Sequence, residues 1–83
     1  MEWLYAKGIP IEAQFLYRKA LDFSLHGRDE EALKYFRQSV LIAPGYARAL
    51  FEMGNCFARL GRLVEAREKY DQALHLHADS PRT

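Results

Sequence analysis

The residues best suited to chemistry in this chain of 83 residues are three histidines and one cysteine. His75 and His77 are two positions apart, so on a helix they point in different directions, whereas metal-binding pairs on helices use spacings of three or four. Asp79, four positions after His75, would complete only a weak site. The alternative is a set of solvent-facing side chains near a helix C-terminus, where positive charge is stabilising. We therefore expect no metal site.

The other candidates for catalysis have simpler explanations. Cys56 follows Asn55 and has no histidine near it in sequence, which favours a semi-buried structural thiol over a nucleophile. Glu30 and Glu31 begin a predicted helix, where acidic side chains favour the helix dipole, so we interpret them as capping residues. The glycines form neither a GxGxxG nor a GxxxxGK pattern. We expect no enzymatic activity and no cofactor.

Composition indicates one small globular domain. Hydrophobic residues make up 49% and charged residues 28% of the chain. The net charge is +1, and the basic residues are mixed with acids, so no concentrated basic face is expected for nucleic acid. The longest apolar run, 40–43, is far shorter than the roughly 20 residues of a membrane span. The N-terminus does not resemble a signal peptide, and a single cysteine fits a reducing compartment. We expect a cytoplasmic protein with neither nucleic-acid nor membrane partners.

Four segments have helical periodicity and are separated by glycine or proline. They span about 11–25, 29–42, 46–60 and 63–77. The apolar stripes predicted to face the core are Leu16, Ala20 and Phe23; Ala32, Phe36 and Val40; Leu50, Met53, Gly54 and Phe57; and Ala66, Tyr70 and Leu74. No stretch alternates with a period of two over the length of a strand, so the predicted fold class is all-α.

The first residues allow two interpretations. Residues 1–7 are followed by Gly8, Ile9 and Pro10, which is typical of a helix end with a glycine cap and a proline beyond it. This pattern predicts a short N-terminal helix. The alternative is a frayed tail with Trp3 packed on the first helical hairpin, because very short helices are marginal unless packed.

An internal repeat organises most of the chain. Residues 13–46 align with 47–80 without a gap, and GRDEEALKYF at 27–36 returns as GRLVEAREKY at 61–70. Each unit predicts two helices joined by a glycine turn. A single hairpin of this kind cannot bury its apolar face, so the copies must stack.

A helix–turn–helix unit of 34 residues resembles the tetratricopeptide repeat. That family requires small, glycine, alanine, aromatic, alanine and proline residues at fixed positions. The first unit supplies Ala20, Gly27, Ala32, Phe36, Ser39 and Pro44; the second supplies Gly54, Gly61, Ala66, Tyr70, Ala73 and Ala78, with Pro81 arriving late. The resemblance implies a right-handed solenoid of two hairpins. Its parts would be an N-terminal segment 1–12, repeat 1 at 13–46, repeat 2 at 47–80 and a tail 81–83.

Two other architectures compete with this interpretation. The pentatricopeptide repeat has a similar hairpin and binds RNA, but its units usually have 35 residues in long arrays. The 34-residue spacing and Pro44 favour the tetratricopeptide repeat. A generic helical bundle would not require a gapless internal repeat.

The resemblance also implies a binding surface, because the first helix of each unit in this family lines the concave side. The positions concerned correspond to Gln14, Tyr17, Leu21, Ser24 and Leu25, then to Arg48, Phe51, Asn55, Ala58 and Arg59. We take Gln14, Tyr17, Leu21, Arg48, Phe51, Asn55 and Arg59 as the candidate peptide-binding groove. Tyr17, Leu21 and Phe51 lie off the predicted core stripes and need a second partner, which is either a peptide or a neighbouring helix.

The chemistry of these positions indicates the kind of ligand. Family members that clamp a C-terminal carboxylate use a lysine and an asparagine in their first clamp repeat, and of the corresponding positions here only Asn55 matches. Arg48 and Arg59 flank Phe51 and instead suggest a ligand with acidic and apolar groups. We expect a non-enzymatic protein–protein interaction module that binds a protein or peptide.

The alternative function is self-association. Two repeats are few for a stable array, and Leu74 and Leu76 on the last helix would face water. A second copy could cover such an uncapped face, since aromatic residues are common in interfaces. This alternative predicts a homodimer.

Overall fold

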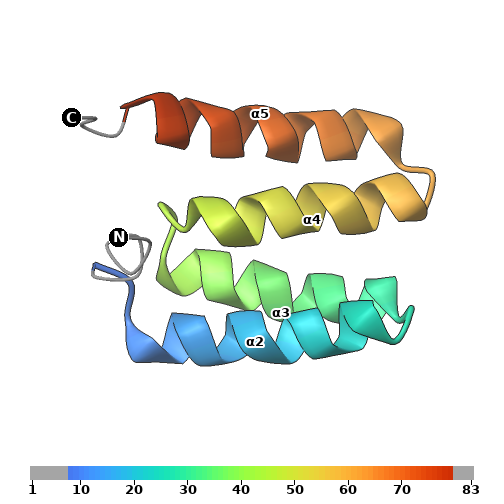
Figure 1. The fold of residues 1–83 in the computed structure, drawn as a ribbon, viewed down its shortest axis with the longest axis horizontal. Helices are drawn as coiled ribbons and strands as arrows, with labels where there is room; N and C mark the ends of the chain where they lie inside the picture. The colour runs from blue at the N-terminus through green and yellow to red at the C-terminus, as the bar shows by residue number, and fades with distance from the viewer. Residues whose placement is uncertain (1–7, 80–83) are drawn as a thin grey trace.

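The computed structural model describes residues 8–79, with side chains through Leu76. The helices are α2 (Ile11–Leu25), α3 (Asp29–Ile42), α4 (Ala47–Arg59) and α5 (Leu63–Asp79). They lie side by side in chain order, each antiparallel to the next (Figure 1). Within 8–79 there is no strand, and the predicted helix bounds are correct to within two residues, so the all-α prediction is confirmed. The predicted N-terminal helix and Trp3 fall outside the described residues.

The two hairpin turns are built in the same way. Gly27 has φ 76° and Gly61 has φ 79°, a left-handed conformation that costs other residues about 1–2 kcal/mol. The N–H of Gly27 donates to the carbonyl of Ser24, and the N–H of Arg28 donates to the carbonyl of Phe23. The same pair of bonds follows Gly61, so both helices end in a Schellman motif. The repeated glycines therefore reverse the chain.

The arginine after each turn glycine explains the rest of the repeated motif. Nε of Arg28 lies 2.7 Å from Oε1 of Glu31, and Nε of Arg62 lies 2.7 Å from Oε1 of Glu65. Each guanidinium also lies over the ring of the phenylalanine five positions earlier. Helix α3 has no side-chain cap hydrogen bond. Glu30 and Glu31 do lie in the first turn of α3, as expected, and the Glu31 carboxylate also pairs with Arg28.

Small residues allow the helices of each hairpin to cross closely. Ala20 and Ala32 are completely buried between α2 and α3, together with the ring of Phe36. In the second hairpin, a Cβ added at Gly54 would lie only 2.6 Å from the ring of Tyr70. These contacts hold α2 on α3 and α4 on α5, and α3 packs on α4 to join the hairpins.

The core follows the predicted stripes most closely in α4. All four predicted residues of that helix, Leu50, Met53, Gly54 and Phe57, are buried. Ser39, at a position where the family pattern has alanine, is completely buried, and its Oγ donates to the carbonyl of Ala13 at 2.7 Å.

The other stripes are buried less completely. Leu16, Phe23, Val40 and Tyr70 are half-buried, and all of these except Leu16 pack against the core. Leu74 is 64% exposed, so its assignment to the core stripe was wrong and the expectation that it faces water is confirmed. The reason is that no described helix packs on the outer side of α5. The same expectation of facing water was wrong for Leu76, which is half-buried against the core.

Candidate functional site

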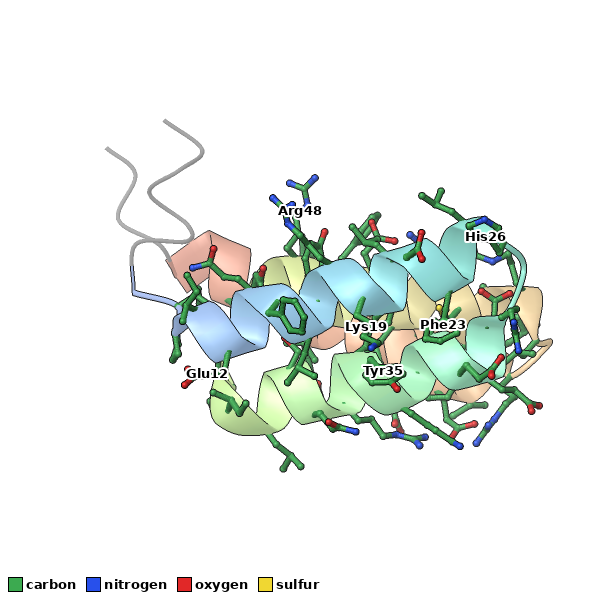
Figure 2. All side chains as sticks on the ribbon, turned by 90° about the horizontal axis from the view of Figure 1, so that it is seen from below. Glu12, Lys19, Phe23, His26, Tyr35 and Arg48 are labelled. Carbon is green, nitrogen blue, oxygen red and sulfur yellow. The ribbon has the colours of Figure 1, made fainter. Side chains whose placement is uncertain are left out.

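The candidate groove residues lie on α2 and α4, the first helices of the two hairpins. These two helices contact each other beside the larger contact between α3 and α4. We call the surface formed by Tyr17, Leu21, Arg48, Phe51 and Asn55 the α2/α4 face. Figure 2 shows Arg48 extending past α2 on the side away from α3. Lys19 and Phe23, by contrast, lie toward Tyr35 of α3.

Tyr17 and Leu21 form the floor of the α2/α4 face. Both are half-buried against the core. The Tyr17 ring centroid is 5.8 Å from that of Phe36 and 5.1 Å from that of Tyr46, so Tyr17 contacts both α3 and the residue that precedes α4. Burial raises the pKa of Tyr17, while the nearby Arg48 guanidinium opposes this rise. For Tyr17, part of the required second partner is therefore Tyr46 at the start of α4.

Phe51 and Asn55, both on α4, are held by contacts with Tyr70 of α5. The Phe51 side chain is 47% exposed, and its ring centroid lies 5.6 Å from that of Tyr70. The Tyr70 hydroxyl donates to Oδ1 of Asn55 at 2.6 Å, and Nδ2 of Asn55 donates to Oε1 of Glu52 at 3.3 Å. Asn55 is thus held in one orientation, with an exposed aromatic ring one helical turn away.

Two residues of this arrangement were missed by sequence reasoning. Tyr70 was assigned to the core only, and Glu52 was not considered. Glu52 lies four positions after Arg48 and three before Asn55, a spacing that places all three on one side of α4. That spacing was the signal that could have identified it.

Arg59 takes part in the junction between hairpins. Its Nη2 lies 2.9 Å and its Nε 3.0 Å from the two carboxylate oxygens of Asp29, and Nη2 also donates to Oγ of Ser24 at 2.7 Å. The hydrogen bonds from Arg59 hold the pKa of the Asp29 carboxyl below its usual value, although burial works against them. The Asp29 side chain is 9% exposed, whereas that of Arg59 is 48% exposed. Arg59 therefore already has a carboxylate partner within the chain.

Gln14 and Cys56 both interact with other parts of the fold. Nε2 of Gln14 donates to the carbonyl of Ile9 at 2.8 Å, beside the start of α2. Cys56 is completely buried, and burial raises the pKa of its thiol to about 11. A thiol with such a pKa is protonated at neutral pH and is a poor nucleophile. Cys56 is fully buried, whereas the sequence predicted partial burial.

One hollow of the described surface lies away from the α2/α4 face. It has a volume of about 440 Å³, is open to solvent and is lined by Pro44, Leu50, Asp71, Gln72, His75 and Leu76. None of the candidate groove residues lines it. The α2/α4 face is therefore described by its exposed side chains.

Among the residues that the structure describes, no three His, Cys, Asp or Glu side chains gather in a way that could hold a metal ion. Likewise, no helix within 8–79 combines the length and the apolar character needed to cross a membrane.

Comparison with known proteins agrees with the architecture. The model of the tetratricopeptide repeat family matches residues 17–81. An uncharacterized protein of Methanocaldococcus jannaschii is 33% identical over 63 residues, which cover 76% of this chain and 73% of that protein. Repeats of this family generally serve as non-catalytic modules for protein–protein interaction. With two stacked hairpins and a family match over most of its length, the chain belongs to the tetratricopeptide repeat family.

Proposed function

We propose that the protein is a non-enzymatic interaction module that binds a partner protein on the α2/α4 face, with repeat units at 13–46 and 47–80. The observation that carries this proposal is the exposure of Phe51 beside Arg48, next to an Asn55 amide fixed by Tyr70. Isolated exposed apolar residues are common, but here an aromatic ring, a cation and an oriented amide occur together. Such a set can bind one ligand through three kinds of contact.

The ligand that fits best is an extended peptide or a helix with an acidic and an apolar side chain close together. The apolar group would lie on Phe51 and the acidic group would pair with Arg48. Asn55 would bond the backbone of an extended peptide. Arg59 contributes less than the family resemblance implied, because Asp29 already occupies it. The protein is expected to act in the cytoplasm, without nucleic acid, membrane, metal or cofactor.

A selection from a displayed peptide library on the immobilised chain tests this proposal. Selected peptides should be enriched in acidic and apolar residues, and their affinity should fall at least about tenfold for the Arg48→Ala/Phe51→Ala double variant. Losing an aromatic and an arginine anchor typically costs more than about 1 kcal/mol each. Isothermal titration with the selected peptides measures the change.

Lys34→Ala/Leu41→Ala serves as the matched control. It also removes one cation and one large apolar side chain, and both residues are exposed on α3. Affinity for the control should equal that of the unmodified chain. Equal affinity for the groove double variant would remove the α2/α4 face as the binding site.

A second candidate function is self-association through the uncapped faces of the stack. Leu25 at the end of α2 is 81% exposed, and Leu63 and Leu74 on α5 are 66% and 64% exposed. Side chains of this size at both ends of a short stack favour contact with another copy. This candidate uses the ends of the stack, whereas peptide binding uses the α2/α4 face, so the two functions are compatible.

A further inference from the structure

At the two ends of the described stack, leucine occupies the repeat positions that form the ion pair at the junction between the hairpins. Inside the stack, Asp29 of α3 pairs with Arg59 of α4. The residue 34 positions after Asp29 is Leu63, and the residue 34 positions before Arg59 is Leu25. A second copy stacked in the register of the hairpin junction would place Leu63 of one copy against Leu25 of the next. Both leucines are more than half exposed and available for such a contact.

A neighbouring pair of positions shows the reverse difference: its residues are apolar at the internal junction and charged at the two ends of the stack. One turn further along the junction, Leu33 of α3 and Cys56 of α4 are buried. Leu33 is four positions after Asp29, and Cys56 is three positions before Arg59. Because α3 and α4 are antiparallel, we expect these two residues to lie opposite each other, one turn from the ion pair. Their counterparts 34 positions away are Arg67 on α5 and Asp22 on α2, both exposed. The same stacking would therefore place a guanidinium beside a carboxylate.

We infer that copies of this chain associate head to tail, the outer side of α5 in one copy on the outer side of α2 in the next. This inference deepens the second candidate function and rests on it. Where the internal junction has an ion pair followed by an apolar pair, the contact between copies has an apolar pair followed by an ion pair. If the α5 faces of two copies met each other instead, Arg67 of one copy would lie near Arg67 of the other. The repulsion between these like charges is unfavourable.

Other positions make the contact between copies weaker than the internal junction. Phe15, 65% exposed on α2, stands where α4 has the completely buried Ala49, and Lys19 stands where α4 has the buried Met53. A larger ring holds two helices further apart, and a buried lysine must keep its amine near water. The association is therefore reversible and depends on concentration.

Head-to-tail contact also sets the kind of assembly. Each copy uses a different face at each end, so every added copy leaves one face of each kind free. The mean mass should rise steadily with concentration and not stop at a dimer. This outcome differs from the homodimer expected from the sequence.

Sedimentation velocity on the full chain, from micromolar to near-millimolar concentration, tests the arrangement. Leu25→Arg and Leu63→Asp should each weaken association at least about tenfold, because each places a lone charge opposite a leucine. An equimolar mixture of the two variants should associate again, since the arginine of one meets the aspartate of the other as Arg59 meets Asp29. The single chain carrying both changes should also associate.

Controls separate the possible failures. Leu41→Arg, at an exposed position on α3, should not change the mass, and circular dichroism should show the same helix content for all variants. A monomer at every concentration would overturn self-association and the head-to-tail arrangement together. If Leu63→Asp abolishes association while Leu25→Arg does not, or if the mixture stays monomeric, self-association stands but the head-to-tail arrangement is overturned. Peptide binding on the α2/α4 face is measured separately and does not depend on these results.

Discussion

At the scale of single residues, Asp29 and Arg59 form the polar contact that fixes how the two hairpins stack. The pair has bidentate geometry, with three nitrogen–oxygen contacts between 2.9 and 3.1 Å. Its two members are unequal, because Asp29 is buried and Arg59 is half-exposed. Removing one member therefore has a different consequence from removing the other.

We expect Arg59→Leu to reduce the free energy of unfolding by about 2 kcal/mol, because it leaves the Asp29 carboxylate buried without its cation. Asp29→Leu should cost about 1 kcal/mol or less, since the Arg59 guanidinium can turn to water. The double variant should be no less stable than Arg59→Leu alone. Urea denaturation measures all three, with Lys34→Leu on the exposed side of α3 as the control. Equal costs for the two single variants would contradict this difference in burial.

Stability should also depend on pH through Asp29. Its pKa in the folded chain is lowered, chiefly by the hydrogen bonds from Arg59, below an unfolded value of about 3.9. A lowered folded pKa contributes stability that is present above the unfolded pKa and is lost as pH falls through the folded pKa. The stability difference between the unmodified chain and Asp29→Asn should be constant near neutral pH and shrink below about pH 4. Urea midpoints at several pH values measure it, and a difference independent of pH would exclude Asp29 as the titrating group.

The role of Arg59 shows where sequence reasoning stops at this scale. The resemblance assigned Arg59 to the groove, but its partner is 30 positions away and on another helix. No local spacing indicates that contact; it depends on the register in which the hairpins stack. The exposed positions Arg48 and Phe51 were identified through the family resemblance, and for Phe51 the periodicity of α4 added that it lies off the core stripe.

At the scale of the elements, the four helices were predictable because their boundaries are set locally. Glycine in a left-handed conformation ends α2 and α4, and apolar periodicity defines the faces between those ends. The failure at Leu74 has a different origin. Its periodicity is that of a buried residue, but burial requires another helix on the outer side of α5, and none of the described helices lies there.

The turn glycines provide a test at this scale. Gly27→Ala and Gly61→Ala should each lower the free energy of unfolding by about 1 kcal/mol, because alanine is strained in the left-handed conformation. Gly45→Ala is the matched control: its φ is not positive and an added Cβ there meets no neighbouring atom within 4 Å. Thermal denaturation followed by circular dichroism should show a lower midpoint for the two turn variants only. A similar loss for Gly45→Ala would mean that general glycine content, and not the turn geometry, sets stability.

At the scale of the whole molecule, two short hairpins gain stability by stacking and leave three kinds of surface. The inner junction is closed by Tyr17, Tyr46 and the Asp29–Arg59 pair. The end faces carry exposed leucines, and the α2/α4 face presents Arg48 and Phe51. The stack was predictable from the 34-residue repeat. Which side chains form the junction, the end faces and the α2/α4 face became clear only from their positions in the structure.

The most direct measurement is a titration of the isotope-labelled chain with a peptide selected on it, followed by two-dimensional NMR of the backbone amides. Binding on the α2/α4 face should shift the signals of Arg48, Phe51 and Asn55 in a saturable manner. Signals of Leu41 on α3 and Leu63 on α5 should remain in place. Saturable shifts confined to α3 or to the outer side of α5, with Arg48 and Phe51 unaffected, would contradict the proposed binding face.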